Sequence, residues 1–376
     1  MIQCHCRHGR MSHSSRSRNA VVPSLKLRRY RSVFAIVLLL FVSNGFATDA
    51  LETTGRLAEQ EMRVLAERFP GRMAGSEQER AAARYLADRL ADFGYRAQLQ
   101  EFPVRYSFHP LGGQALNERD ARSANVVAEL SGRSDRLIII GAHYDTAVAR
   151  TEAQAEAGIG GPQLQGVDDN ASGVGVILEL AARLAGTAPE HTIRFIAFGS
   201  EEVGLLGARH AVAAMDESER DRVVLMVNID SIITGDYLYV HAGPSTYAAD
   251  PKAGAFREQA REIAAGRDIE LRTNPGLNPD YPTGTGCCSD QIAFDEAGIT
   301  VINFEATNWA LGDKDGYQQT AINSAFPTGE SWHSVERDSL THLETHLPRG
   351  RLSERPAQVV SILLALLEQW SGLTAE

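Results

Sequence analysis

The sequence has few cysteines, no internal repeats, no low-complexity linker and no apolar run long enough to span a membrane. Of its four cysteines, Cys4 and Cys6 lie in the N-terminal leader described below. The remaining two, Cys287 and Cys288, are too few for a zinc site built from thiolates alone. In an oxidising compartment these neighbours could close a vicinal disulfide, and two free buried thiols are an equal alternative.

Basic residues are scarce outside the N-terminus. Residues 1–47 hold eight of the 37 Lys and Arg residues and none of the 48 Asp and Glu residues, so residues 48–376 carry a formal charge of −19. A protein that binds nucleic acid needs a positive surface to meet the phosphates. The acidic body therefore argues against a nucleic-acid partner.

The N-terminal region has the order of features of an export signal. Basic residues at 26–31 precede an apolar run at 32–42, and the small residues Gly45 and Ala47 follow it. The apolar run is shorter than the roughly 20 residues of a spanning helix, which disfavours a membrane anchor. We expect residues 1–47 to be a cleaved signal peptide, with a later start codon as an alternative. The body would then be periplasmic or secreted, without a stable membrane anchor.

The pattern of the remaining chain predicts one α/β domain, residues 48–376, in an oligomeric state that the sequence does not specify. Apolar runs predict five strands, at 125–130, 136–141, 192–198, 222–229 and 300–304. Amphipathic patterns predict four helices, at 75–93, 172–185, 205–215 and 356–370. Continuous apolar strands that alternate with helices are typical of a mostly parallel central sheet flanked by helices. The Gly- and Pro-rich stretch 272–290 predicts a long functional loop.

Three of the predicted strands are followed by side chains that bind metals. These side chains are His143 and Asp145 after the second strand, Glu201 and Glu202 after the third, and Asp230 after the fourth. Ligand sites in open α/β sheets lie beyond the carboxyl ends of the strands, so we expect one metal site there. Each residue alone also fits a structural role, such as a helix cap or an acid at a helix start. Together they favour the metal site.

These residues carry a resemblance to a known family. The motifs GAHYDT at 141–146, GVDDNASG at 166–173 and GSEEVGLLG at 199–207 resemble, in order and spacing, the M28 peptidases, which are zinc aminopeptidases with two co-catalytic zinc ions. The resemblance implies a zinc-exopeptidase fold and hydrolysis of the N-terminal peptide bond of peptides or proteins. It also implies two Zn²⁺ ions as cofactors, with Co²⁺ or Mn²⁺ as possible substitutes.

The resemblance further implies a role for each site residue. The metal ligands would be His143, Asp168, Glu202, Asp230 and His333. Asp168 would bridge both ions, and its peptide bond to Asp169 would be cis. Glu201 would be the general base, and Asp145 would hydrogen-bond the distal nitrogen of His143. Four residues separate His333 from the next aspartate, where many members have three, so His342 and His346 remain alternative ligands.

One member of the family implies a substrate preference. This sequence resembles it at 274–278, 284–288 and 305–309, and that member removes basic N-terminal residues such as Arg. We therefore expect a preference for Arg or Lys. A pocket for such a side chain needs a buried acid, and the candidates are Asp290, Asp295 and Glu305. Cys287 and Cys288 would border the same pocket.

Four other functions are compatible with these motifs. The fold of the family also serves carboxypeptidases and dipeptidases, which differ in the charge of the pocket, and glutaminyl cyclases, which typically use one zinc. A non-catalytic ectodomain that binds a ligand is the alternative from another class. Such relatives lose metal ligands, whereas this sequence retains a residue at each expected position together with Glu201.

Overall fold

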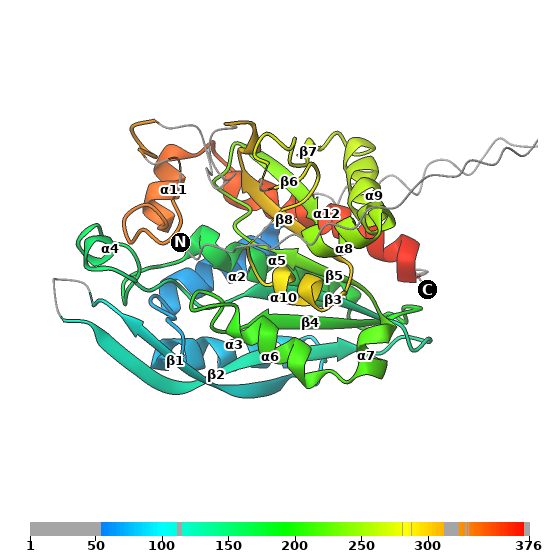
Figure 1. Cartoon of the computed structure of the whole chain (residues 1–376), viewed down its shortest axis with the longest axis horizontal. Helices are drawn as coiled ribbons and strands as arrows, with labels where there is room; N and C mark the ends of the chain where they lie inside the picture. The colour runs from blue at the N-terminus through cyan, green and yellow to red at the C-terminus, as the bar shows by residue number, and fades with distance from the viewer. Residues whose placement is uncertain are drawn as a thin grey trace, which may run out of the picture. The chain divides into compact units, whose positions relative to one another are not determined.

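The strands of the protein lie in one sheet (Figure 1). The structure is a computed structural model, and it describes residues 54–110, 115–279, 281–286, 288–311, 323–327, 329 and 331–371. The strands are β1 (Gln98–Phe108), β2 (Asn117–Leu130), β3 (Leu137–His143), β4 (Thr192–Phe198), β5 (Val223–Ile229), β6 (Tyr237–Ala242), β7 (Leu271–Arg272) and β8 (Val301–Thr307). Their order across the sheet is β1-β2-β4-β3-β5-β8-β6-β7. The predicted strands correspond to parts of β2, β3, β4, β5 and β8.

The centre of the sheet is parallel and its margins are mixed. β4, β3, β5 and β8 run parallel to one another, whereas β1 with β2, β2 with β4 and β6 with β8 are antiparallel. Every residue of β3 is buried, as expected for a parallel strand covered on both faces. The predicted α/β class with a parallel centre is confirmed.

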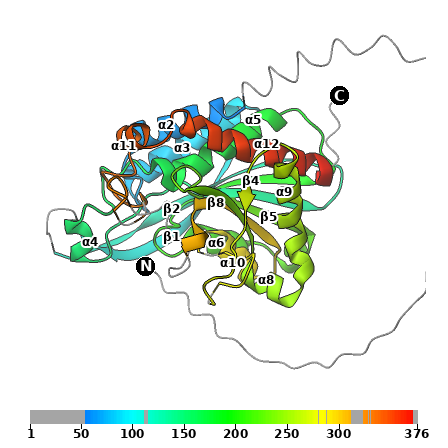
Figure 2. The same ribbon diagram turned by 90° about the horizontal axis from the view of Figure 1, so that it is seen from above.

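Helices cover both faces of this sheet (Figure 2). They are α2 (Arg56–Arg68), α3 (Glu77–Asp92), α4 (Glu152–Glu156), α5 (Gly173–Leu184), α6 (Leu206–Ala214), α7 (Glu217–Arg222), α8 (Pro244–Ala249), α9 (Ala255–Ala265), α10 (Gln291–Glu296), α11 (Leu340–His346) and α12 (Arg351–Ser371). The larger apolar core joins α2, α3, α5 and α12 to one face, and a smaller core joins α6 and α10 to the other. The four predicted helices correspond to α3, α5, α6 and α12.

The parallel arrangement decides where the site lies. The carboxyl ends of β3, β4 and β5 meet at one edge of the sheet, because the three strands are neighbours and point the same way. The turns after these strands carry the polar side chains that the sequence singles out. Residues Thr53–Glu376 form one compact unit.

The predicted leader, residues 1–47, lies outside the described residues, so its cleavage and the division into leader and domain stay predictions. Within the described part of the chain, no helix combines the length and apolar character needed to cross a membrane.

Candidate metal centre

Two groups of possible metal ligands lie at the carboxyl edge of the sheet and share one residue. The ligand atoms of His143, Asp169 and Asp230 all lie within 4.8 Å of one another, and so do those of Asp169, Glu202 and His333. Asp169 Oδ1 lies 3.0 Å from His143 Nε2, and Asp169 Oδ2 lies 3.1 Å from His333 Nε2. Each oxygen of this carboxylate therefore faces a different group, so one anion could lie between two cations and offset their repulsion.

The remaining contacts complete the two groups. Asp230 Oδ1 lies 3.4 Å from His143 Nε2, and Glu202 Oε2 lies 3.3 Å from His333 Nε2. The other oxygen of Glu202 is buried and has no hydrogen-bond partner. Imidazole nitrogens and carboxylate oxygens are the donors that catalytic zinc sites use, so this set of side chains fits Zn²⁺.

The electrostatics also favour cations. Burial raises the pKa of Glu202 to about 8, with a further increase from the charge of Asp169. Burial likewise raises the pKa values of Glu201 and Asp290 well above their ordinary range, and neighbouring carboxylates add to the effect. Buried carboxylates this close together repel one another when they are ionised. Metal ions bound between them would supply the positive charge that offsets this repulsion.

The structure corrects the expectation for Asp168, whose carboxylate points away from both groups. Asp168 Oδ1 accepts a hydrogen bond from the backbone N–H of Ile233 at 2.8 Å, and Oδ2 accepts one from Thr234 at 2.9 Å. Because its oxygens meet the turn after β5, Asp168 does not lie between the two groups, and Asp169 is the aspartate whose oxygens do. The cis peptide bond is likewise one residue further along, between Asp169 and Asn170.

Two residues that the sequence did not single out hold this turn. Asp338 accepts hydrogen bonds from the backbone N–H groups of Asp168 at 2.8 Å and Asp169 at 3.2 Å. The fully buried Arg72 donates to the carbonyl oxygens of Gln165 and Gly166, and to that of Tyr144 beside His143. The position of Asp338 shortly after His333 is the only signal of its role in the sequence, and Arg72 has none.

His333 is placed with the site, whereas His342 and His346 lie on α11, with their ring centroids 4.4 Å apart. The His333 side chain is 43% exposed and approaches Asp169 and Glu202 from the segment before α11. His342 instead lies on α11, where its Nε2 is 3.1 Å from the carbonyl oxygen of Ala325 and its ring packs against Phe326.

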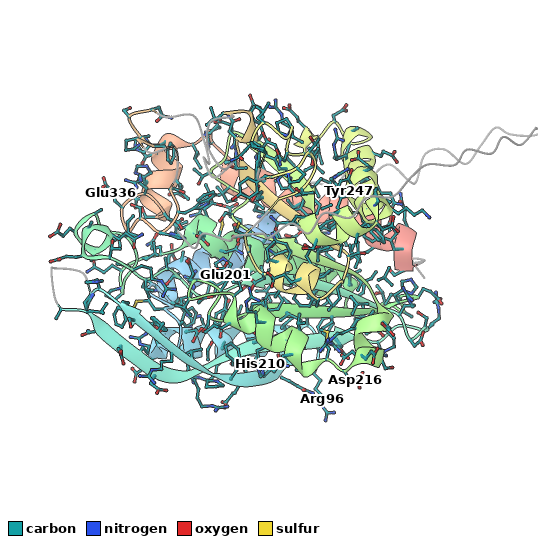
Figure 3. The ribbon with its side chains drawn as sticks, in the orientation of Figure 1. Arg96, Glu201, His210, Asp216, Tyr247 and Glu336 are labelled. Atoms are coloured by element: carbon teal, nitrogen blue, oxygen red, sulfur yellow. The ribbon has the colours of Figure 1, made fainter. Side chains whose placement is uncertain are left out.

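Asp145 connects the first group to the turn that carries the two glutamates. Its Oδ1 lies 3.6 Å from His143 Nδ1, which is long for a hydrogen bond. The same carboxylate accepts hydrogen bonds from the backbone N–H groups of Glu201 at 2.9 Å and Glu202 at 3.2 Å. Figure 3 shows Glu201 in the interior of the ribbon, whereas the labelled Asp216 and Arg96 lie at its margin. Asp145 thus holds the backbone of the turn that carries the candidate base, and lies beside the imidazole of His143.

The three acids expected near a substrate side chain have different surroundings. Asp295 accepts hydrogen bonds from Ser245 and Thr246 at the start of α8, so its role is structural. Asp290 is fully buried, and neither of its oxygens has a partner. The Glu305 side chain is 12% exposed and contacts His241.

The two cysteines expected beside this region are described only in part. Cys288 is disulfide-bonded and packs near Leu205, which follows the Glu201–Glu202 turn. Cys287 lies outside the described residues.

Comparison with known proteins identifies relatives of the whole domain. The sequence profile described as "Peptidase family M28" matches residues 125–349. The chain is 42% identical to the alkaline phosphatase isozyme conversion protein of Escherichia coli, over 84% of this chain and 90% of that protein. It is 30% identical to the aminopeptidase YwaD of Bacillus subtilis, over 55% of this chain and 37% of that protein.

Solved structures share the fold at low sequence identity. A zinc aminopeptidase from Bacillus subtilis matches with a TM-score of 0.61 at 18% identity, over 84% of this chain and 95% of that one. A glutaminyl cyclase from Fimbriiglobus ruber matches with a TM-score of 0.59 at 18% identity, over 84% and 94% of the two chains. Proteins with two different activities therefore share this architecture.

Proposed function

Since the chain belongs to peptidase family M28, we propose that it is a zinc-dependent aminopeptidase that hydrolyses the N-terminal peptide bond of peptides or proteins. We further propose that it uses two zinc ions, that it is exported to the periplasm or secreted, and that it prefers N-terminal Arg or Lys. The observation that carries the proposal is the pair of three-residue ligand groups that share the Asp169 carboxylate.

The ligands divide between the two ions as the groups do. His143, Asp169 and Asp230 would hold one zinc, and Asp169, Glu202 and His333 would hold the other. Bound zinc lowers the pKa of a water molecule toward neutrality and polarises the substrate carbonyl. Co²⁺ or Mn²⁺ could replace zinc, because the ligand set contains only imidazole and carboxylate groups.

Glu201 would move the proton during the reaction. As water adds to the carbonyl carbon, the Glu201 carboxylate takes a proton from it, and it later gives that proton to the leaving amine as the C–N bond breaks. The hydrogen bond from its backbone N–H to Asp145 fixes its position beside the ligands. Because burial raises the pKa of Glu201, its carboxylate is a stronger base than one exposed to water.

The requirement for a free N-terminus would follow from the charge of the site. The α-ammonium group of a substrate lies two bonds from the carbonyl carbon that reacts. A carbonyl placed beside Glu201 therefore brings this cation among the carboxylates of the site, including the partly exposed Asp230, which favour a positive charge. The export proposal is supported by the order of basic, apolar and small residues at 26–47.

The test is hydrolysis of N-terminal amino-acid amides by purified residues 48–376. We expect release of a chromophore from Leu and Arg amides, loss of that release with a chelator, and its return when zinc is added. Glu201→Gln should retain zinc and lose about 10²- to 10⁴-fold in kcat, the usual contribution of a general base.

Activity that survives both complete removal of metal and the substitution would contradict the proposal. No activity on any amide with two zinc ions bound would also contradict it, and would favour a carboxypeptidase, a dipeptidase or a non-catalytic binding role.

A further inference from the structure

Glu305 lies beside the metal centre, one strand further along the sheet. The backbone N–H of Asp230 bonds to the carbonyl oxygen of Phe304, and the N–H of Ala306 bonds to that of Ser231. Asp230 and Glu305 are therefore neighbours across β5 and β8, and the register puts them on the same face of the sheet. Adjacent strands lie about 5 Å apart, so the backbone of Glu305 is roughly that far from a metal ligand.

The carboxylate of Glu305 is held by two neutral donors. Its Oε1 accepts a hydrogen bond of 2.6 Å from Trp309 Nε1 and lies 2.9 Å from His241 Nε2. His241 Nδ1 accepts a hydrogen bond from the backbone N–H of Asn274, so the ring carries its proton on Nε2 and is neutral. Neither donor cancels the negative charge of Glu305, and no Lys or Arg of the described residues forms an ion pair with it.

Aromatic rings surround this carboxylate. The Trp309 ring lies edge-on to His241, with ring centroids 5.2 Å apart, and to Tyr281 at 5.4 Å. Tyr239, the cross-strand partner of Glu305, stacks on His241 at 5.6 Å. A cation bound here would gain from the charge of the acid, because the aromatic donors Trp309 and His241 hold the carboxylate without an ion pair to Lys or Arg among the described residues.

The loop that supplies Tyr281 is tied to the same cluster. Asn274 is 1% exposed, and its side-chain amide donates to the carbonyl oxygens of Tyr281, Pro282 and Thr285. A Cβ atom on Gly286 would come within 2.7 Å of the His241 ring, so this loop packs directly on the imidazole. The surroundings of Glu305 are thus built by three separate segments of the chain.

We propose that Glu305 determines the preference for basic substrates by accepting, on Oε2, a hydrogen bond from the guanidinium or ammonium group of the N-terminal side chain. The inference rests on the proposed aminopeptidase function. A basic side chain is the second cation of such a substrate, and its charge lies further from the reacting carbonyl than the α-ammonium group does. The test below separates these two roles of Glu305. Asp295 cannot serve, because helix α8 uses both of its oxygens, and Asp290 has no exposed surface.

The test compares substrates that differ in charge but not in shape. The kcat/KM of the zinc-loaded protein would be measured with Arg, citrulline and Leu amides, since citrulline has the shape of Arg without its charge. The variant is Glu305→Gln, which retains an oxygen to accept from Trp309 and His241. The control is Glu296→Gln, on the exposed side of α10, where the glutamate side chain is 52% exposed.

We expect the wild type to prefer Arg over citrulline, and Glu305→Gln to lower this ratio about 10- to 100-fold, as the loss of a hydrogen bond to a charged group does. Leu and citrulline should change less than about threefold in the same variant, which also shows that it is folded. Glu296→Gln should leave all three substrates unchanged.

Three results would overturn the inference while leaving the aminopeptidase function intact. The first is a wild type that hydrolyses Leu amide without preferring Arg over citrulline. The second is an Arg-to-citrulline ratio that Glu305→Gln does not change. The third is an equal fall for all three substrates in Glu305→Gln, which would assign Glu305 to the α-ammonium group. A wild type inactive on every amide would instead contradict the proposed function itself.

Discussion

Asparagine substitutions at the adjacent Asp168 and Asp169 are expected to have different effects. Asp169→Asn should lower zinc binding, whereas Asp168→Asn should lower the free energy of unfolding. Asp169→Asn removes the negative charge that the two ligand groups share, so each zinc loses an anionic ligand and the repulsion between the ions is no longer offset. Substitutions outside the ligand set typically cost about 10- to 100-fold in metal affinity or activity, so the loss of a shared ligand should exceed that. The fold should persist, because the backbone N–H of residue 169 still reaches Asp338.

Asp168→Asn should instead retain zinc and lower stability. Both oxygens of Asp168 accept backbone N–H groups, from Ile233 and Thr234. An asparagine offers one oxygen and one NH₂ group, so one of these buried N–H groups would face another donor. An unsatisfied buried donor costs about 1–3 kcal/mol, and the free energy of unfolding should fall by that amount.

The assay is zinc content per chain after dialysis against a zinc buffer, together with urea unfolding of the same samples. Asp169→Asn should hold fewer than two zinc ions and show little amide hydrolysis. Asp168→Asn should hold the wild-type amount and unfold at lower urea. If Asp168→Asn lost zinc while Asp169→Asn retained it, the proposal that Asp169 is the shared metal ligand would be wrong.

Three further substitutions test the support of the site. Asp145→Asn should weaken zinc about 10- to 100-fold in competition with a chelator, and an unchanged affinity would contradict its positioning role. Arg72→Met leaves the carbonyl groups of Tyr144, Gln165 and Gly166 without this donor, so the free energy of unfolding in urea should fall by about 3 kcal/mol. Replacement of the exposed Arg105 by Met should be neutral. Burial raises the pKa of Glu79 from 4.5 to about 8, so the folded state binds its proton more tightly. The raised pKa of Glu79 therefore contributes to the free energy of unfolding below pH 4.5, and this contribution is lost as the pH rises through about 8. In urea titrations at several pH values, Glu79→Gln should show a smaller loss of stability with rising pH.

The sequence predicted the parts of the fold that follow from periodicity. The run at 192–198 is β4 without change, and 136–141 lies almost wholly within β3, because apolar runs of this length need cover on both faces of a sheet. β1, β6 and α2 were missed. β1 pairs with β2 at the margin of the sheet, and its residues alternate between buried and exposed from Phe102 to Tyr106. This alternation is typical of a strand with one solvated face, whereas the strands predicted from the sequence were continuous apolar runs.

The sequence motifs predicted which segments form the site, but not the direction in which each side chain points. His143, Glu202, Asp230 and His333 meet where the motifs indicate. Asp168 and Asp169 are chemically identical, and which of them faces His143 depends on backbone contacts to Asp338 and to the turn after β5. No local pattern encodes the pairing of Glu305 with His241, because it arises from the antiparallel register of β8 and β6.

The most direct test of the account is mass spectrometry of products from one peptide in two forms, with a free and with an acetylated N-terminus. We expect the zinc-loaded protein to remove single residues from the N-terminal end of the free peptide and to leave the acetylated one intact, with chelator stopping the reaction. Loss of residues from the C-terminal end, or equal cleavage of the acetylated peptide, would contradict the central claim that this protein is an aminopeptidase.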